Sequence, residues 1–204
     1  MKRWISGLLL VLFGSMVYAD PTIVDSWAEV PVPAAPELKA VKVDPATTAL
    51  LVLDFQDQTV SPRPRAVATV PRVKGLLDFA RASHLLVAYS TTTAGTREAI
   101  LPALQPLAEE HVVKASVDKF FGTDLEEYLK SHGIQQVIIT GIVTEGAVLG
   151  TSIGASLRGF KVIVPVDGTA SSTLYAEQYV AWHLLNAPGV RGNVTLTRTD
   201  LIGL

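Results

Sequence analysis

Short apolar runs alternate with segments of helical spacing, and this alternation constrains the fold more than any other feature of the chain. The predicted strands are Ala49–Leu53, Leu85–Tyr89, His111–Val113, Val137–Thr140, Lys161–Val166 and Val194–Thr197. The predicted helices between and after them are Pro71–Ala82, Thr96–Ala108, Asp124–Ser131, Gly146–Leu157 and Tyr175–Leu185. Strands that are apolar along their whole length are typical of a parallel sheet covered on both faces. With right-handed crossovers, the pattern predicts a doubly wound α/β fold, a three-layer sandwich.

The composition excludes several classes of protein. The chain has 204 residues, no cysteine, 49% apolar and 18% charged residues, and a formal net charge of −2. Without cysteine there is no disulfide scaffold, thiolate zinc site, iron–sulfur cluster or cysteine nucleophile. The charge balance does not indicate a nucleic-acid partner, and the apolar content argues against disorder. No cofactor is indicated, and no metal centre is expected because no metal-ligand spacing links the four histidines, His84, His111, His132 and His183.

The first 19 residues have the features of a secretory signal peptide. Lys2 and Arg3 precede an apolar run, Ile5–Val17, and the run ends in a plausible cleavage site after Ala19. The run is shorter than the roughly 20 residues of a spanning helix. We therefore expect an exported protein, periplasmic or secreted, without a stable membrane span after cleavage; the alternative is an uncleaved anchor. Residues 20–47 are rich in proline and predict an extended arm, and residues 48–204 form the predicted domain.

Polar residues at the predicted strand ends indicate where the chemistry lies. In an open parallel sheet, ligands bind beyond the carboxyl ends of the strands. Asp54 follows the first predicted strand, Lys114 follows the third, and a helix begins near Gly146 after the fourth. The free amides at a helix N-terminus suit an anion or a developing oxyanion. An acid, a lysine and a helix start are therefore predicted to converge on one edge of the sheet.

Three segments carry a resemblance to a known family. VDPATTALLVLDFQDQ, KASVDKFFGTDLEEYL and QQVIITGIVTEGAVLGTSIGASLRGFKVIVPVDGTAS, which span residues 43–171, resemble the isochorismatase-like hydrolase family. The resemblance implies a six-stranded, mostly parallel sheet and catalysis by an aspartate, a lysine and usually a cysteine. The aspartate matches Asp54, and we match the lysine to Lys114. The slot of the nucleophile is occupied by Ala147.

The alanine in this slot decides which mechanisms of the family are open. Ala147 has no atom that can attack a carbonyl carbon, which closes the covalent thioester route. Nicotinamidase-like members also carry an Asp and His pair for a metal, and the corresponding segment 90–100 has no histidine. True isochorismatases lack the cysteine and hydrolyse a vinyl ether with a proton and water. In that mechanism Asp54 is the general acid and Lys114 positions or tunes it. Burial would raise the pKa of the acid and the cation would lower it, and the sequence leaves the balance open.

Further residues are predicted to line the substrate site. These candidates are Phe55, Gln56, Phe120, Val143, Thr144 and Gly146. For Phe120, a place in the apolar core is an equally good interpretation. The resemblance also implies a cis peptide bond at Val143–Thr144. A G-x-S-x-G pattern at residues 150–154 lies inside a predicted helix, away from the strand-to-helix turn that a nucleophilic serine needs, so we do not interpret it as a serine hydrolase.

Two functions remain open at this level. The first is an exported hydrolase of a small molecule that uses acid–base catalysis without a cysteine nucleophile. The second is a catalytically reduced relative that binds a small molecule or acts as an assembly partner. Relatives are often dimers or tetramers, so a homo-oligomer is also an expectation. No nucleic-acid partner is expected.

Overall fold

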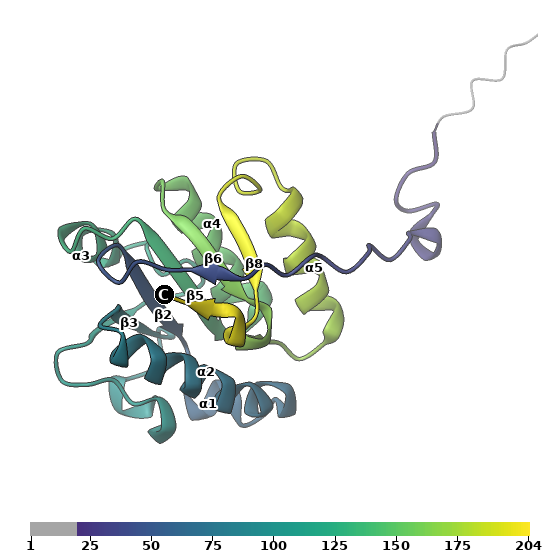
Figure 1. Cartoon of the computed structure of the whole chain (residues 1–204). Coiled ribbons are helices and arrows are strands. Elements are labelled where there is room, and N and C mark those ends of the chain that lie inside the picture. Colours follow the sequence, from purple (N-terminus) through teal and green to yellow (C-terminus); the bar gives the residue numbers. More distant parts are fainter. Residues whose placement is uncertain (1–19) are drawn as a thin grey trace, which may run out of the picture. The chain divides into compact units, whose positions relative to one another are not determined.

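The computed structural model describes residues 20–204, which form two units (Figure 1). The predicted signal peptide lies outside the described residues. Residues 20–34 contain a turn at 23–25 and one turn of 3-10 helix, η1 (Trp27–Glu29), and residues 35–204 form the second unit. Within residues 20–204 no helix is both long and apolar enough to cross a membrane.

A parallel sheet forms the centre of the second unit. Its strands are β2 (Thr48–Leu53), β3 (Leu86–Thr91), β4 (His111–Lys114), β5 (Gln136–Ile142), β6 (Lys161–Pro165) and β8 (Val194–Thr197). They lie in the order β4-β3-β2-β5-β6-β8, and every pairing is parallel. A seventh short strand that the sequence analysis missed, β7 (Thr169–Ala170), pairs with the end of β5. The predicted parallel α/β architecture is confirmed.

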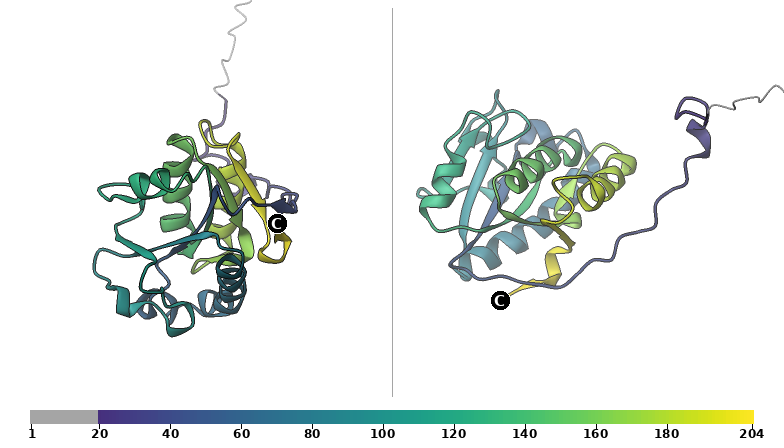
Figure 2. Two further views of the ribbon diagram at one scale, coloured as in Figure 1. Left: turned by 60° about the vertical axis from the view of Figure 1, so that its left-hand side comes forward. Right: turned by 90° about the horizontal axis from the view of Figure 1, so that it is seen from above.

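Helices cover both faces of this sheet (Figures 1 and 2). One face carries α1 (Asp57–Val60) and α2 (Pro64–Ala82), and the other carries α3 (Leu125–Ser131), α4 (Leu149–Leu157) and α5 (Leu174–Asn186). Strand β2 shows why both layers are needed, since all six of its residues are buried. Leu51 and Leu53 pack into the core under α3, α4 and α5, whereas Leu50 and Val52 pack into the core under α2. The alternation of side chains along a strand thus supplies two cores.

Three helical predictions differ from the structure. The helix predicted at 71–82 begins at Pro64, because Ala66 and Thr69 extend its buried stripe before Pro71. The helix predicted at 96–108 is replaced by two 3-10 turns, η2 (Arg97–Ala99) and η3 (Pro102–Leu104), since prolines interrupt the segment. The helix predicted to start at Gly146 starts as a π-helical turn, η4 (Thr144–Val148), which leads into α4.

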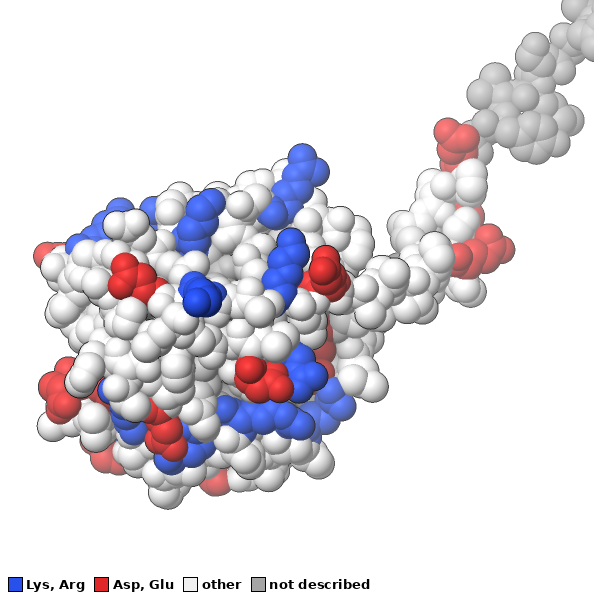
Figure 3. Space-filling view, viewed as in Figure 1, with Lys and Arg blue, Asp and Glu red and all other residues white. Residues whose placement is uncertain are grey.

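The predicted boundary of the arm at residue 47 also differs from the structural division. Strand β1 (Val41–Lys42) pairs with β9 (Ile202–Gly203), and the Lys39 amide donates a hydrogen bond to the Leu196 carbonyl. Residues 35–47 therefore belong to the second unit. The later part of this unit also contains two 3-10 turns, η5 (Val166–Gly168) and η6 (Thr199–Leu201). On the face shown in Figure 3, acidic and basic side chains of this unit are interspersed.

Candidate active site

Asp54 is the first residue beyond β2, and its backbone is held in a conformation that few residues adopt. Its φ of 56° lies in the left-handed region, which costs a non-glycine residue about 1–3 kcal/mol and is enriched at functional sites. The Asp54 amide donates a hydrogen bond to the Ser90 carbonyl at 3.1 Å, and the Thr59 hydroxyl donates one to the Asp54 carbonyl. The Ser90 hydroxyl donates to Asp54 Oδ1 at 2.6 Å. These bonds fix the direction of the carboxyl group.

The partner of this carboxyl group is Lys119. Its Nζ atom lies 2.7 Å from Asp54 Oδ2, and its side chain has no solvent exposure. Nζ also donates hydrogen bonds to the carbonyls of Ala115, at 3.2 Å, and Ser116. All three donors of the ammonium group are therefore used, as a buried lysine requires.

The prediction that Lys114 pairs with Asp54 was wrong. Lys114 is the last residue of β4 and its side chain is exposed. Lys119 is the fifth residue beyond the strand, and the loop between them brings this lysine to the carboxyl group of Asp54. One feature of the sequence points to Lys119: it lies directly before the FFGTDL segment. In the structure the first residue of that segment, Phe120, is buried.

Burial raises the pKa of Asp54 above the usual value of a carboxyl group. The ammonium of Lys119 and the hydrogen bond from Ser90 act in the opposite direction, and burial outweighs them. A carboxyl group with a raised pKa holds its proton to a higher pH. This is the property that a general acid needs near neutrality.

Position 147 lies on the element that completes this edge. Ala147 is in η4, is 5% exposed, and belongs to the same apolar cluster as Leu53 and Phe120, the neighbours of Asp54 and Lys119. One helical turn further on, Thr151 Oγ1 accepts a hydrogen bond from the Lys119 amide at 3.3 Å. Asp54, Lys119 and Ala147 are thus held by elements that contact one another, and the assignment of Ala147 to the nucleophile slot stays a prediction.

Two glycines allow the loop that carries Lys119 to lie directly on α4. A Cβ atom at Gly150 would lie 2.5 Å from Val117 Cγ1, and one at Gly154 would lie 2.4 Å from Asp118 Oδ1. The small-residue face of this helix therefore serves close packing. Ser152, the central residue of the G-x-S-x-G pattern, is fully buried inside α4, away from a strand-to-helix turn.

Two of the predicted substrate contacts lie in the apolar cores, on opposite faces of the sheet. Phe55 packs in the core under α2, and Phe120 stacks on Phe160 with 5.8 Å between ring centroids. Gln56 is buried, and its Oε1 accepts a hydrogen bond from the Thr92 amide at 2.9 Å. Burial of a large aromatic ring contributes strongly to stability, which explains why both phenylalanines lie in the apolar cores.

The remaining predicted contacts lie at the end of β5, beside the slot. Val143 and Gly146 are half-buried, and Thr144 is buried with no hydrogen-bond partner for its hydroxyl. Their contact with substrate stays a prediction. The cis peptide bond lies at Ile142–Val143, one residue before the predicted position. Within residues 20–204 no three His, Asp or Glu side chains group in a way that could hold a metal ion.

Comparisons with known proteins agree with this architecture. The isochorismatase domain family matches residues 48–199. Streptothricin hydrolase from Streptomyces noursei is 30% identical over 136 residues, which cover 60% of this chain and 49% of that protein. Maleamate amidohydrolase from Pseudomonas putida is 27% identical, covering 57% of this chain and 68% of that protein. The solved structure of an isochorismatase-like hydrolase from Alkaliphilus metalliredigens superposes with a TM-score of 0.68 at 26% identity, covering 76% of this chain and 96% of that one. The match spans only about half of the streptothricin hydrolase.

Proposed function

The chain belongs to the isochorismatase family, and on that premise we propose that it is a hydrolase of small molecules that uses Asp54 as its acid–base group and Lys119 as the adjacent cation. The observation that carries this proposal is the buried pair of Asp54 and Lys119, 2.7 Å apart at the carboxyl edge of the sheet. Ligands of open parallel sheets bind at this edge. The relatives that are hydrolases by name support the same class of reaction.

In the proposed reaction no covalent enzyme intermediate forms, because the methyl group of Ala147 cannot attack the substrate. With a vinyl ether, protonated Asp54 donates its proton to the alkene carbon, water adds to the resulting oxocarbenium carbon, and the proton released by the water returns to the Asp54 carboxylate. The hemiketal then collapses: its C–O bond to the leaving alcohol breaks, the leaving oxygen takes a proton, and the hydroxyl loses one to give the carbonyl product. Lys119 holds the carboxylate in place between these steps. The amides at the start of η4, near Gly146, are proposed to bind an anionic group of the substrate or the attacking water.

One set of contacts favours the second candidate, a binding protein without catalysis. The three donors of Lys119 and both carboxylate oxygens of Asp54 are satisfied inside the protein, which is also how a purely structural ion pair would look. The left-handed backbone at Asp54 favours the hydrolase, since strain of this kind is concentrated at active sites.

A substrate screen with two matched variants separates the two candidates. The full chain is assayed against small amides, esters and vinyl ethers, and Asp54→Asn is compared with Asp57→Asn, which changes an exposed aspartate three residues away. Loss of a general acid is expected to lower the rate by about 10²–10⁴-fold, with Asp57→Asn unchanged. Full turnover by a folded Asp54→Asn variant would exclude the acid role. A protein that hydrolyses no compound but is stabilised by some of them against heat is a binding protein.

We also propose that the protein is exported and that it forms a homo-oligomer. The positive charges at Lys2 and Arg3 and the apolar run after them support export. The proline-rich residues 20–34 are the part of the chain that would reach a second copy.

A further inference from the structure

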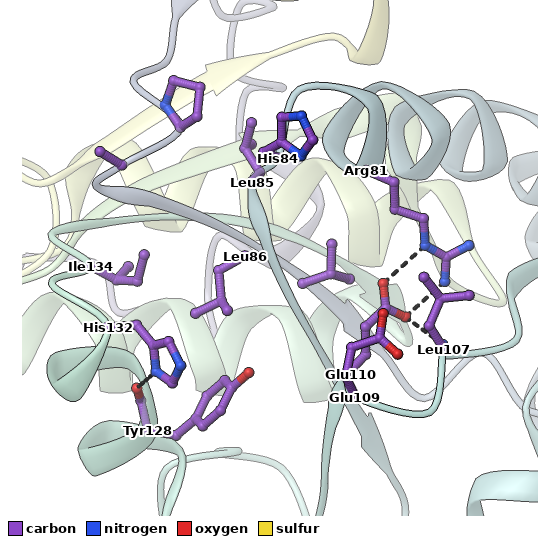
Figure 4. Close-up of a pocket in the computed structure, with 13 residues that line it drawn as sticks. Arg81, His84, Leu85, Leu86, Leu107, Glu109, Glu110, Tyr128, His132 and Ile134 are labelled. Atoms are coloured by element: carbon purple, nitrogen blue, oxygen red, sulfur yellow. Dashed lines mark hydrogen bonds and ion pairs between the residues drawn. The ribbon is translucent and has the colours of Figure 1, made fainter.

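A cleft of about 440 Å³ lies at the amino edge of the sheet, opposite to the edge of Asp54 (Figure 4). Its lining includes Ala46, Leu86, Glu110 and Ile134, which lie at or just before the first residues of β2, β3, β4 and β5. Strand β2 separates the two edges, and its six residues span roughly 20 Å. The volume is in the range of small-molecule sites, about 300–1,000 Å³. The cleft is therefore distinct from the proposed active site.

The cleft joins an apolar floor to an aromatic wall. Leu86 and Ile134 contribute to the floor. Tyr128 on α3 and His132, directly after that helix, form one side, with 4.5 Å between their ring centroids. The Tyr128 ring also stacks on His111, with 4.3 Å between centroids, so the ring is covered and its hydroxyl is the group offered to a ligand. In Figure 4 the hydroxyl of Tyr128 points into the space between this wall and the glutamates on the far side. That hydroxyl has no hydrogen-bond partner among residues 20–204. Burial, and to a smaller extent the charge of Glu110, raises the pKa of Tyr128, so the ring stays neutral.

The charges on the far side leave one carboxylate free. Arg81 Nε and Nη2 bind the two carboxylate oxygens of Glu110 at 2.9 and 2.7 Å, so this pair is neutral. Glu109, next to it, is exposed and makes no ion pair or hydrogen bond within the described part of the chain. With its two histidines neutral, the lining carries a net charge of −1. This excess negative charge would repel an anion. The one cationic residue in the lining, Arg81, is already paired with Glu110.

We propose that this cleft binds a small organic cation, an ammonium or guanidinium group carried on an apolar or aromatic body. The cationic group lies beside the Glu109 carboxylate and the hydroxyl of Tyr128, where charge attraction favours it. The apolar body lies on Leu86 and Ile134. The free hydroxyl of Tyr128 accepts a hydrogen bond from the cation.

Three probes of the same shape and different charge test this proposal. Binding of benzylammonium, benzyl alcohol and benzoate to the full chain is measured by ligand-observed NMR at about pH 8 and low salt. We expect benzylammonium to bind more tightly than the alcohol, benzoate to bind least, and added salt to weaken the benzylammonium signal. Equal or tighter binding of benzoate, or no binding of any probe at millimolar concentration, would overturn the proposal.

Matched variants locate the binding in this cleft. Glu109→Gln is expected to weaken benzylammonium by about fivefold, the size of one partly exposed charge interaction. Glu98→Gln, which changes an exposed glutamate outside the cleft, is expected to leave it unchanged. Both side chains are exposed, so both variants are expected to fold. Equal affinities in these two variants would mean that the cation binds elsewhere and that the assignment is wrong.

Discussion

Replacing Lys119 with methionine tests the ion pair on which the proposed mechanism depends. The change removes the ammonium 2.7 Å from Asp54 and leaves the carbonyls of Ala115 and Ser116 without their donor. At this separation and an effective dielectric constant of about 20, the attraction between the two charges is about 6 kcal/mol before desolvation is counted. Desolvation offsets part of it, and removing one partner of a buried pair costs about 3–5 kcal/mol. We therefore expect Lys119→Met to lower the melting temperature by about 6–20 °C.

The assays are thermal denaturation and urea denaturation of three purified variants beside the parent protein. Lys114→Met is the matched control, because Lys114 is exposed and its loss is expected to change the free energy of unfolding by less than about 0.5 kcal/mol. The double variant Asp54→Asn/Lys119→Met carries no unpaired charge and is expected to be more stable than Lys119→Met alone. If Lys119→Met and Lys114→Met lose equal stability, the ion pair is not what stabilises this edge and the reasoning fails.

The pH dependence of the Lys119→Met variant gives a second check on the same contact. Burial raises the pKa of Asp54 and Lys119 opposes it, so the variant raises this pKa further. An acid whose pKa is higher in the folded than in the unfolded state loses stability as the pH rises through the folded pKa. The stability difference between parent and variant is therefore expected to grow as the pH rises from the Asp54 pKa of the parent towards the higher Asp54 pKa of the variant, and to level off above it. A difference that stays constant from acidic to weakly alkaline pH contradicts the raised pKa.

Three further predictions concern other parts of the chain. Gly95→Ala is expected to lower the free energy of unfolding in urea by about 1–3 kcal/mol, because the new Cβ would lie 1.8 Å from Nε2 of buried Gln56. The control Gly75→Ala, on the exposed side of α2, is expected to raise it by about 0.5–1 kcal/mol. Ala147→Cys is expected to react with iodoacetamide faster than free cysteine, because the start of a helix and a nearby cation favour the thiolate; an ordinary rate would contradict the assigned slot. Mass spectrometry of the secreted protein is expected to show cleavage after Ala19, and an intact N-terminus would refute this site.

The sheet and the acid are features that local sequence determines. Apolar runs such as Ala49–Leu53 give the strands, and the residue that follows each run lies at the carboxyl edge because all central strands are parallel. Asp54 could therefore be placed without a structure. Ala147 is singled out by the resemblance to the family and not by the strand pattern, and its role as the nucleophile slot stays a prediction.

Tertiary structure alone decided which lysine meets Asp54 and which residues line the second cleft. Lys114 and Lys119 are five residues apart, and the path of the loop between them, packed on Gly150 and Gly154 of α4, turns Lys119 inward. The cleft around Glu109 likewise unites residues from the starts of several strands and from α3, which no local pattern connects. Periodicity reports the environment of a single segment, whereas a site is formed by side chains that become neighbours only when distant segments pack together.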